Sequence, residues 1–172
     1  MAEIRLQFSA QHTLSSWLIR FASLGDPKLD VSHVDYVDPR NGGWLLGARH
    51  DWVRRHGLGD IPPGVRLRPP GYRTFSRIEV MAVPCTNRQS VDFGAYLVRE
   101  MGLPYNDAAI IGFGLHRSWG TGGSAEECAQ LMIQAGQATQ ILPTGLYEPS
   151  YKITPVECAL VYSAVGGIIV AN

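Results

Sequence analysis

Polar and apolar residues alternate in several short runs of this chain, which is the pattern of β-strands with one buried face. Three such runs cover residues 3–9, 31–37 and 77–83. Two shorter apolar runs, at 44–48 and 65–68, predict further strands. A turn rich in Pro, Asn and Gly separates 31–37 from 44–48, so these two strands are expected to form a hairpin.

A different spacing marks the helices, in which apolar residues recur every three or four positions. This spacing predicts helices over 14–21, 91–101 and 125–138. The apolar tail at 152–170 is interrupted by Pro155 and a Gly-Gly pair, and we interpret it as strand material. Hairpin-like strands mixed with a few helices predict an α+β fold with an antiparallel sheet.

Length and composition favour a single domain over residues 1–172. Of the 172 residues, 45% are hydrophobic and 17% are charged, which is enough for a substantial core. No repeat, low-complexity tract or long linker divides the chain.

Charge and hydropathy exclude several classes of protein. Lys+Arg and Asp+Glu both number 15, so the chain lacks the basic excess of a nucleic-acid-binding protein. We interpret the arginines around Arg49, Arg54, Arg55, Arg66 and Arg68 as a solvated surface. No run of about 20 apolar residues predicts a membrane span, and the N-terminus lacks the layout of a signal peptide. We therefore expect a cytoplasmic location.

Three cysteines, Cys85, Cys128 and Cys158, are widely spaced and odd in number. This argues against a disulfide framework and against a structural zinc cluster. We expect neither a metal nor another cofactor.

Cys128 is the strongest candidate for chemistry because it follows a helix-start pattern. Ser124 and Glu127 have the S-x-x-E spacing of a capping box, which predicts that a helix begins at Ser124. Cys128 then falls in the first turn, where the helix dipole favours a thiolate. The alternative is a core cysteine, because Cys128 also lies on the apolar stripe of its helix.

A thiol nucleophile needs a base and a group that orients the base. His33 lies in the strand 31–37, and Asp35, two residues on, shares its face. His50 is a second polar candidate near the end of the neighbouring strand. A lone strand histidine is also common as a surface group, and His50 with His56 leaves a metal-dependent hydrolase as a further alternative.

Several short motifs follow one another over residues 14–160. In chain order they are Ser16-Trp17-Leu18-Ile19-Arg20, Ser32-His33-Val34, Leu46-Gly47-Ala48, Gly64-Val65-Arg66, Pro104-Tyr105-Asn106, Trp119, Cys128-Ala129-Gln130-Leu131 and Ile153-Thr154-Pro155. Their order and spacing resemble the circularly permuted NlpC/P60 cysteine hydrolases, the papain-like group that includes the YiiX-type and YebB-type bacterial proteins.

The resemblance implies a papain-like α+β fold, with a small antiparallel sheet or partial barrel packed on helices. It also implies Cys128 as nucleophile and His33 as base. The family presents a polar residue on the second strand to orient the base, but this chain has Gly47 there. Asp35 or His50 could take that role. We add Tyr105 as a candidate hydroxyl donor, with a core tyrosine as the alternative.

These expectations define a thiol hydrolase that attacks an amide or ester carbonyl through an acyl-enzyme. The substrate would be a small peptide, an amide or an acyl-lipid. The alternative is a catalytically degenerate binding module on the same fold, and Gly47 is the feature that motivates it.

Overall fold

The computed structural model describes residues 2–12, 31–53, 59–106, 127–145 and 153–171. The predicted helix at 14–21, Ser124, His56 and Trp119 lie outside these residues.

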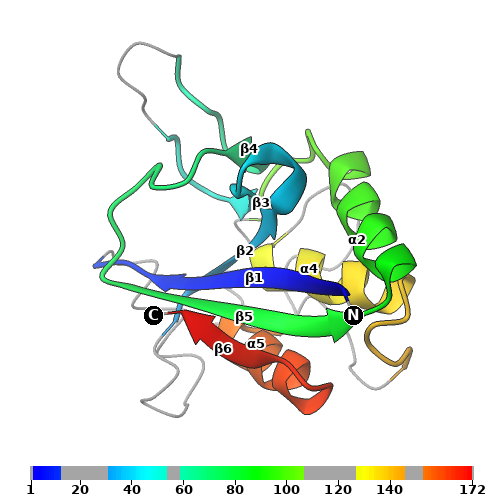
Figure 1. Ribbon diagram of the computed structural model, residues 1–172. Coiled ribbons are helices and arrows are strands. Elements are labelled where there is room, and N and C mark those ends of the chain that lie inside the picture. Colours follow the sequence, from blue (N-terminus) through cyan, green and yellow to red (C-terminus); the bar gives the residue numbers. More distant parts are fainter. Residues whose placement is uncertain (1, 13–30, 54–58, 107–126, 146–152, 172) are drawn as a thin grey trace.

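A six-stranded antiparallel sheet forms the centre of the molecule (Figure 1). Its strands stand in the order β4-β3-β2-β1-β5-β6, so the N-terminal strand lies inside the sheet. The strands are β1 (Ala2–Ala10), β2 (His33–Asp38), β3 (Trp44–Arg49), β4 (Gly64–Arg68), β5 (Arg77–Cys85) and β6 (Ile168–Ala171). The expected hairpin is confirmed, because β2 and β3 pair antiparallel.

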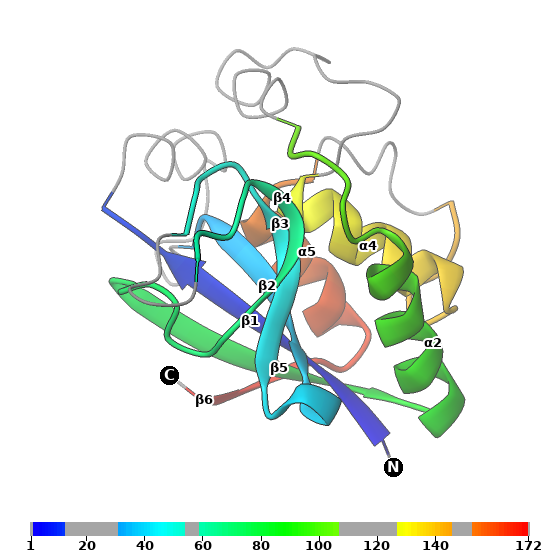
Figure 2. The ribbon, with the colours of Figure 1, turned by 90° about the horizontal axis from the view of Figure 1, so that it is seen from above.

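Three α-helices of the described chain lie together on one side of the sheet (Figure 2). They are α2 (Asn87–Arg99), α4 (Cys128–Ala138) and α5 (Pro155–Ala164). Alternate strand residues such as Phe8, Val34 and Tyr36 point to this side and join the buried residues of the helices in one core. The predicted α+β class with an antiparallel sheet is therefore confirmed. None of the described helices has the length and hydropathy needed to cross a membrane.

The tail was expected to be strand material, and most of it is instead helix α5. Thr154 caps this helix, Pro155 occupies its first turn, and Glu157 completes a capping box. Only Ile168–Ala171 forms a strand, β6. The sequence Thr-Pro-Val-Glu predicts this helix start, whereas the apolar content of the segment favours a strand.

The start of α4 also differs from the expectation. The helix begins at Cys128, not at Ser124, and the carboxylate of Glu127 itself caps it by accepting the backbone N–H groups of Ala129 and Gln130. A glutamate is long enough to fold back over its own helix end. Cys128 is consequently the first residue of α4, and this placement is the basis of the candidate site.

Candidate functional site

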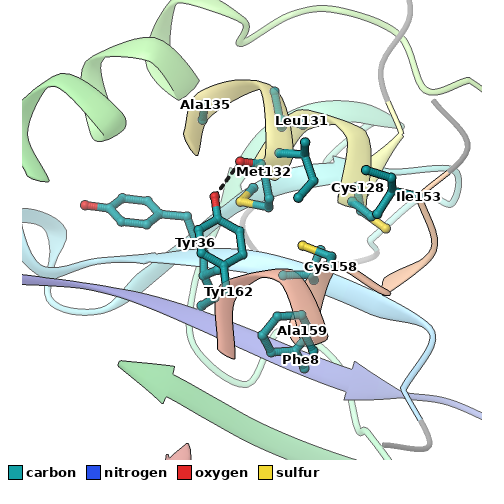
Figure 3. Close-up of a cluster of buried hydrophobic side chains, with 14 of the residues drawn as sticks. Phe8, Tyr36, Cys128, Leu131, Met132, Ala135, Ile153, Cys158, Ala159 and Tyr162 are labelled. Atoms are coloured by element: carbon teal, nitrogen blue, oxygen red, sulfur yellow. Dashed lines mark hydrogen bonds between the residues drawn. The ribbon is translucent and has the colours of Figure 1, made fainter. Parts of the chain in front are cut away.

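Cys128 lies at the N-terminal end of α4, where this helix packs against β2 and β3. Its side chain is buried, with 1% of its surface exposed, and belongs to the hydrophobic cluster that also contains Ile153 and Cys158 (Figure 3). The Sγ–H group donates to Glu127 Oε1 at 3.0 Å. The backbone N–H of Val34 in β2 acts on the thiol and by itself lowers its pKa.

These surroundings favour the thiol over the thiolate. Burial is the main reason why the pKa of Cys128 lies well above its ordinary value, and the adjacent Glu127 carboxylate adds to the rise. The N–H of Val34 acts in the opposite direction but is outweighed. The helix end was expected to favour the anion, but Glu127 brings a negative charge to the same place and reverses that effect.

His33 and Asp35 share one face of β2 and contact each other, as the spacing predicts. Nε2 of His33 lies 2.9 Å from Oδ2 of Asp35, and both side chains are buried. Burial lowers the pKa of His33 more than Asp35 raises it. Burial raises the pKa of Asp35, but His33, Arg68 and Arg49 outweigh burial and lower it to about 2. At neutral pH the pair is therefore a neutral imidazole beside a carboxylate.

Gly47 leaves the space that the Asp35 carboxylate occupies. A Cβ added at Gly47 would collide with Oδ1 of Asp35 and would lie 3.2 Å from its Cγ. The lack of a side chain at position 47 is thus a steric requirement of the carboxylate on the neighbouring strand. Asp35, rather than His50, contacts the His33 ring.

A buried polar network surrounds Asp35 on the sheet face opposite the helices. The Tyr72 hydroxyl donates to Asp35 Oδ2 at 3.1 Å, and Nη1 of Arg49 donates to the same hydroxyl at 3.0 Å. The Arg49 guanidinium also pairs with Asp51 at 2.8 Å. The guanidinium carbons of Arg49 and Arg68 lie 5.5 Å and 5.9 Å from the centre of the Tyr72 ring.

The interpretation of these arginines as a solvated surface is wrong for two of them. Arg49 is 4% exposed and Arg68 is fully buried. Arg68 donates to the carbonyl oxygens of Gly47 at 2.8 Å and Gly64 at 3.0 Å. The alternation along β3 and β4 could have predicted that these two arginines lie together, because Arg49 and Arg68 fall on the same strand face as Gly47. Nothing in the sequence singles out Tyr72, which lies between β4 and β5.

The structure does not bring the Cys128 sulfur and the His33 ring into a hydrogen bond in the described part of the chain. Val34, whose N–H acts on the thiol, separates His33 from Asp35 along β2. The charge of Asp35 still acts on the thiol and contributes to its raised pKa. Cys128 lies on the helix side of β2, whereas the His33 ring extends from the opposite face, so the nucleophile and base candidates are not in direct contact.

The remaining candidates lie elsewhere. His50 and Tyr105 contact each other, with ring centroids 5.8 Å apart, and Tyr105 is part of the hydrophobic core. Cys85 is partly buried, Cys158 is buried within α5, and both thiols are free. Among the described residues, no group of three His, Cys, Asp or Glu side chains could hold a metal ion.

A scan of the sequence against protein-family models finds no match, and comparisons with curated proteins and with solved structures find none either. Function must therefore be inferred from the residues and their geometry. The arrangement supplies a thiol at a helix start and, on the opposite face of β2, a neutral imidazole 2.9 Å from a carboxylate.

Proposed function

We propose that this protein is a thiol hydrolase of papain-like fold that cleaves an amide or ester bond. Cys128 is the nucleophile, His33 the base, and Asp35 the group that orients the base. The observation that carries the proposal is the buried pair of His33 and Asp35, 2.9 Å apart, on the strand against which α4 and Cys128 pack.

The protonation states of His33 and Asp35 allow His33 to act as a base. Asp35 approaches Nε2 of His33, so Nδ1 is the ring nitrogen left to accept the thiol proton. A neutral imidazole can take that proton, and the ionised Asp35 stabilises the imidazolium that forms. Tyr72 and Arg49 hold Asp35 in place through the Tyr72 hydroxyl.

The reaction begins when the start of β2 moves so that the His33 ring, which extends from the sheet face opposite α4, reaches the Cys128 thiol. The S–H bond breaks, the proton passes to His33, and the sulfur bonds to the carbonyl carbon of the substrate. His33 then returns the proton to the leaving amine or alcohol. Water, activated by the same imidazole, hydrolyses the resulting thioester and releases the acid and the free thiol. Small peptides, amides and acyl-lipids all provide such a carbonyl.

Acyl-enzyme formation tests this proposal directly. The protein is mixed with p-nitrophenyl esters of short and long acyl chains, and both nitrophenol release and intact mass are followed. We expect a burst of nitrophenol, with one acyl group mapped to Cys128. Cys128→Ala should abolish the burst, and His33→Ala should slow it by about 10²-fold or more. Cys158→Ala is the matched control and should retain it. Acylation that is as fast in His33→Ala as in the wild type would overturn the proposal.

A second candidate is a binding module that has lost catalysis. It is favoured by Glu127, whose carboxylate engages the Cys128 thiol and the backbone N–H groups of Ala129 and Gln130. These N–H groups at the helix start are therefore occupied and do not face an oxyanion. If the protein is such a binding module, wild-type and Cys128→Ala proteins should give the same ester turnover, with no burst from either.

A further inference from the structure

Glu127 makes an unusual set of contacts for a helix cap. Short side chains such as Ser, Thr, Asp and Asn normally cap helices. Here a fully buried glutamate does so, with Oε1 accepting the N–H of Ala129 at 3.0 Å and Oε2 accepting that of Gln130 at 2.9 Å. Oε1 also accepts the Sγ–H of Cys128 at 3.0 Å. One carboxylate therefore anchors the helix end and the thiol together.

We propose that Glu127 is a latency residue, whose carboxylate accepts the Cys128 Sγ–H at the start of α4 and so withholds the thiol from reaction. The proposal rests on the proposed function only in taking Cys128 as the nucleophile. Because Oε1 touches the reacting sulfur, Glu127 controls when that sulfur can lose its proton.

Burial raises the pKa of Glu127, and the hydrogen bonds that it accepts from Cys128, Ala129 and Gln130 oppose that rise. Glu127 faces the sulfur from the start of α4, and Asp35 acts on it from β2. From α5, Cys158 lies close enough to Glu127 for the two to interact. Opposing them is the N–H of Val34. The ionisable neighbours are thus all groups that become negative, so loss of the Glu127 carboxylate should lower the pKa of the thiol.

The test is the pH profile of Cys128 alkylation in Glu127→Gln. The glutamine oxygen can still accept a backbone N–H of the cap, whereas the negative charge beside the sulfur is gone. Iodoacetamide rates are measured by peptide mapping from pH 6 to 10. We expect the midpoint of the profile to move to lower pH than in the wild type. A midpoint lower by one pH unit should increase the alkylation rate at pH 7 about threefold, because a tenfold gain in thiolate is partly offset by weaker nucleophilicity.

Glu157→Gln is the matched control. It makes the same chemical change at the start of α5, where Glu157 contacts Thr154 and no thiol. This variant should leave the Cys128 profile unchanged, and Cys85, whose pKa is affected by burial and Glu3 rather than by Glu127, provides an internal reference in every sample. An unchanged or higher midpoint in Glu127→Gln would overturn the latency role.

A measurement on the unmodified fold covers the case in which Glu127→Gln does not fold. The infrared S–H band of Cys128 is isolated as the difference between wild type and Cys128→Ala at pH 7. We expect a band at lower frequency than that of a free thiol, because a carboxylate is a strong acceptor. Absence of the band, or a free-thiol frequency, would contradict the proposal. Failure of the hydrolase is distinguishable, since it would remove the ester burst but leave the lower alkylation midpoint and the S–H band.

Discussion

Replacement of Gly47 by alanine should show that Asp35 fills the space above this glycine. The new Cβ would collide with the Asp35 carboxylate and would lie 3.2 Å from the Val34 carbonyl oxygen, which is backbone and cannot yield easily. Overpacking of this kind costs about 1–3 kcal/mol. We expect Gly47→Ala to lower the free energy of unfolding by that amount, and to displace Asp35 from His33.

A double-mutant cycle in urea separates volume from charge. Asp35→Ala removes the collision with the carboxylate and leaves only the contact with the Val34 carbonyl oxygen, so Gly47→Ala should cost clearly less in that background, with a coupling free energy of about 1 kcal/mol or more. Asp35→Asn keeps the volume but removes the charge. In the Asp35→Asn background the cost of Gly47→Ala should persist.

The refuting result is a Gly47→Ala cost that is the same with and without the Asp35 side chain. A neutral Gly47→Ala would refute the reasoning equally. Either outcome would mean that the carboxylate does not occupy the space over β3, and the pairing of Asp35 with His33 would lose its steric basis.

Three further predictions follow from the polar network and the helix caps. The depressed pKa of Asp35 stabilises the fold above its ordinary 3.8, so the stability difference between wild type and Asp35→Asn should shrink as pH falls from about 4 to 2. Urea melts across that range should record a loss of about 2 kcal/mol, and a flat difference would contradict it. Tyr72→Phe should lower the free energy of unfolding by about 1–3 kcal/mol, because Asp35 Oδ2 loses a buried donor; an unchanged urea midpoint would argue against this bond. Thr154→Ala should cost about 1 kcal/mol through loss of the α5 cap, with Thr154→Ser, which keeps the hydroxyl, close to wild type; equal loss in both variants would count against capping.

The strands and two of the helices were predictable because their signals are local. β2 and β3 follow from alternation on either side of a turn, and α2 from apolar spacing. α5 was missed because a helix buried on most sides carries little periodicity, as in Pro155–Ala164, where six of ten residues are buried. Its Thr154 cap was a better signal than its hydropathy.

The candidate site was predictable only in part. Alternation places Asp35 beside His33, and the structure brings them to 2.9 Å. The same reasoning could not find Tyr72, which reaches Asp35 from 37 positions away along the chain. The sequence also predicted that the surroundings of Cys128 favour the thiolate. Burial and the adjacent Glu127 favour the neutral thiol instead.

The sequence by itself determined which residues share a strand face and that Cys128 stands at a helix start, because both depend on backbone geometry over a few residues. The tertiary structure alone decided how deeply each face of the strands is buried. Only packing places the Asp35 carboxylate in the space over Gly47 and removes Arg49 and Arg68 from water. Burial and partner charges set protonation, and they come from residues distant in the chain. For this reason the acid–base state of His33 and Cys128 could be obtained only from the folded molecule.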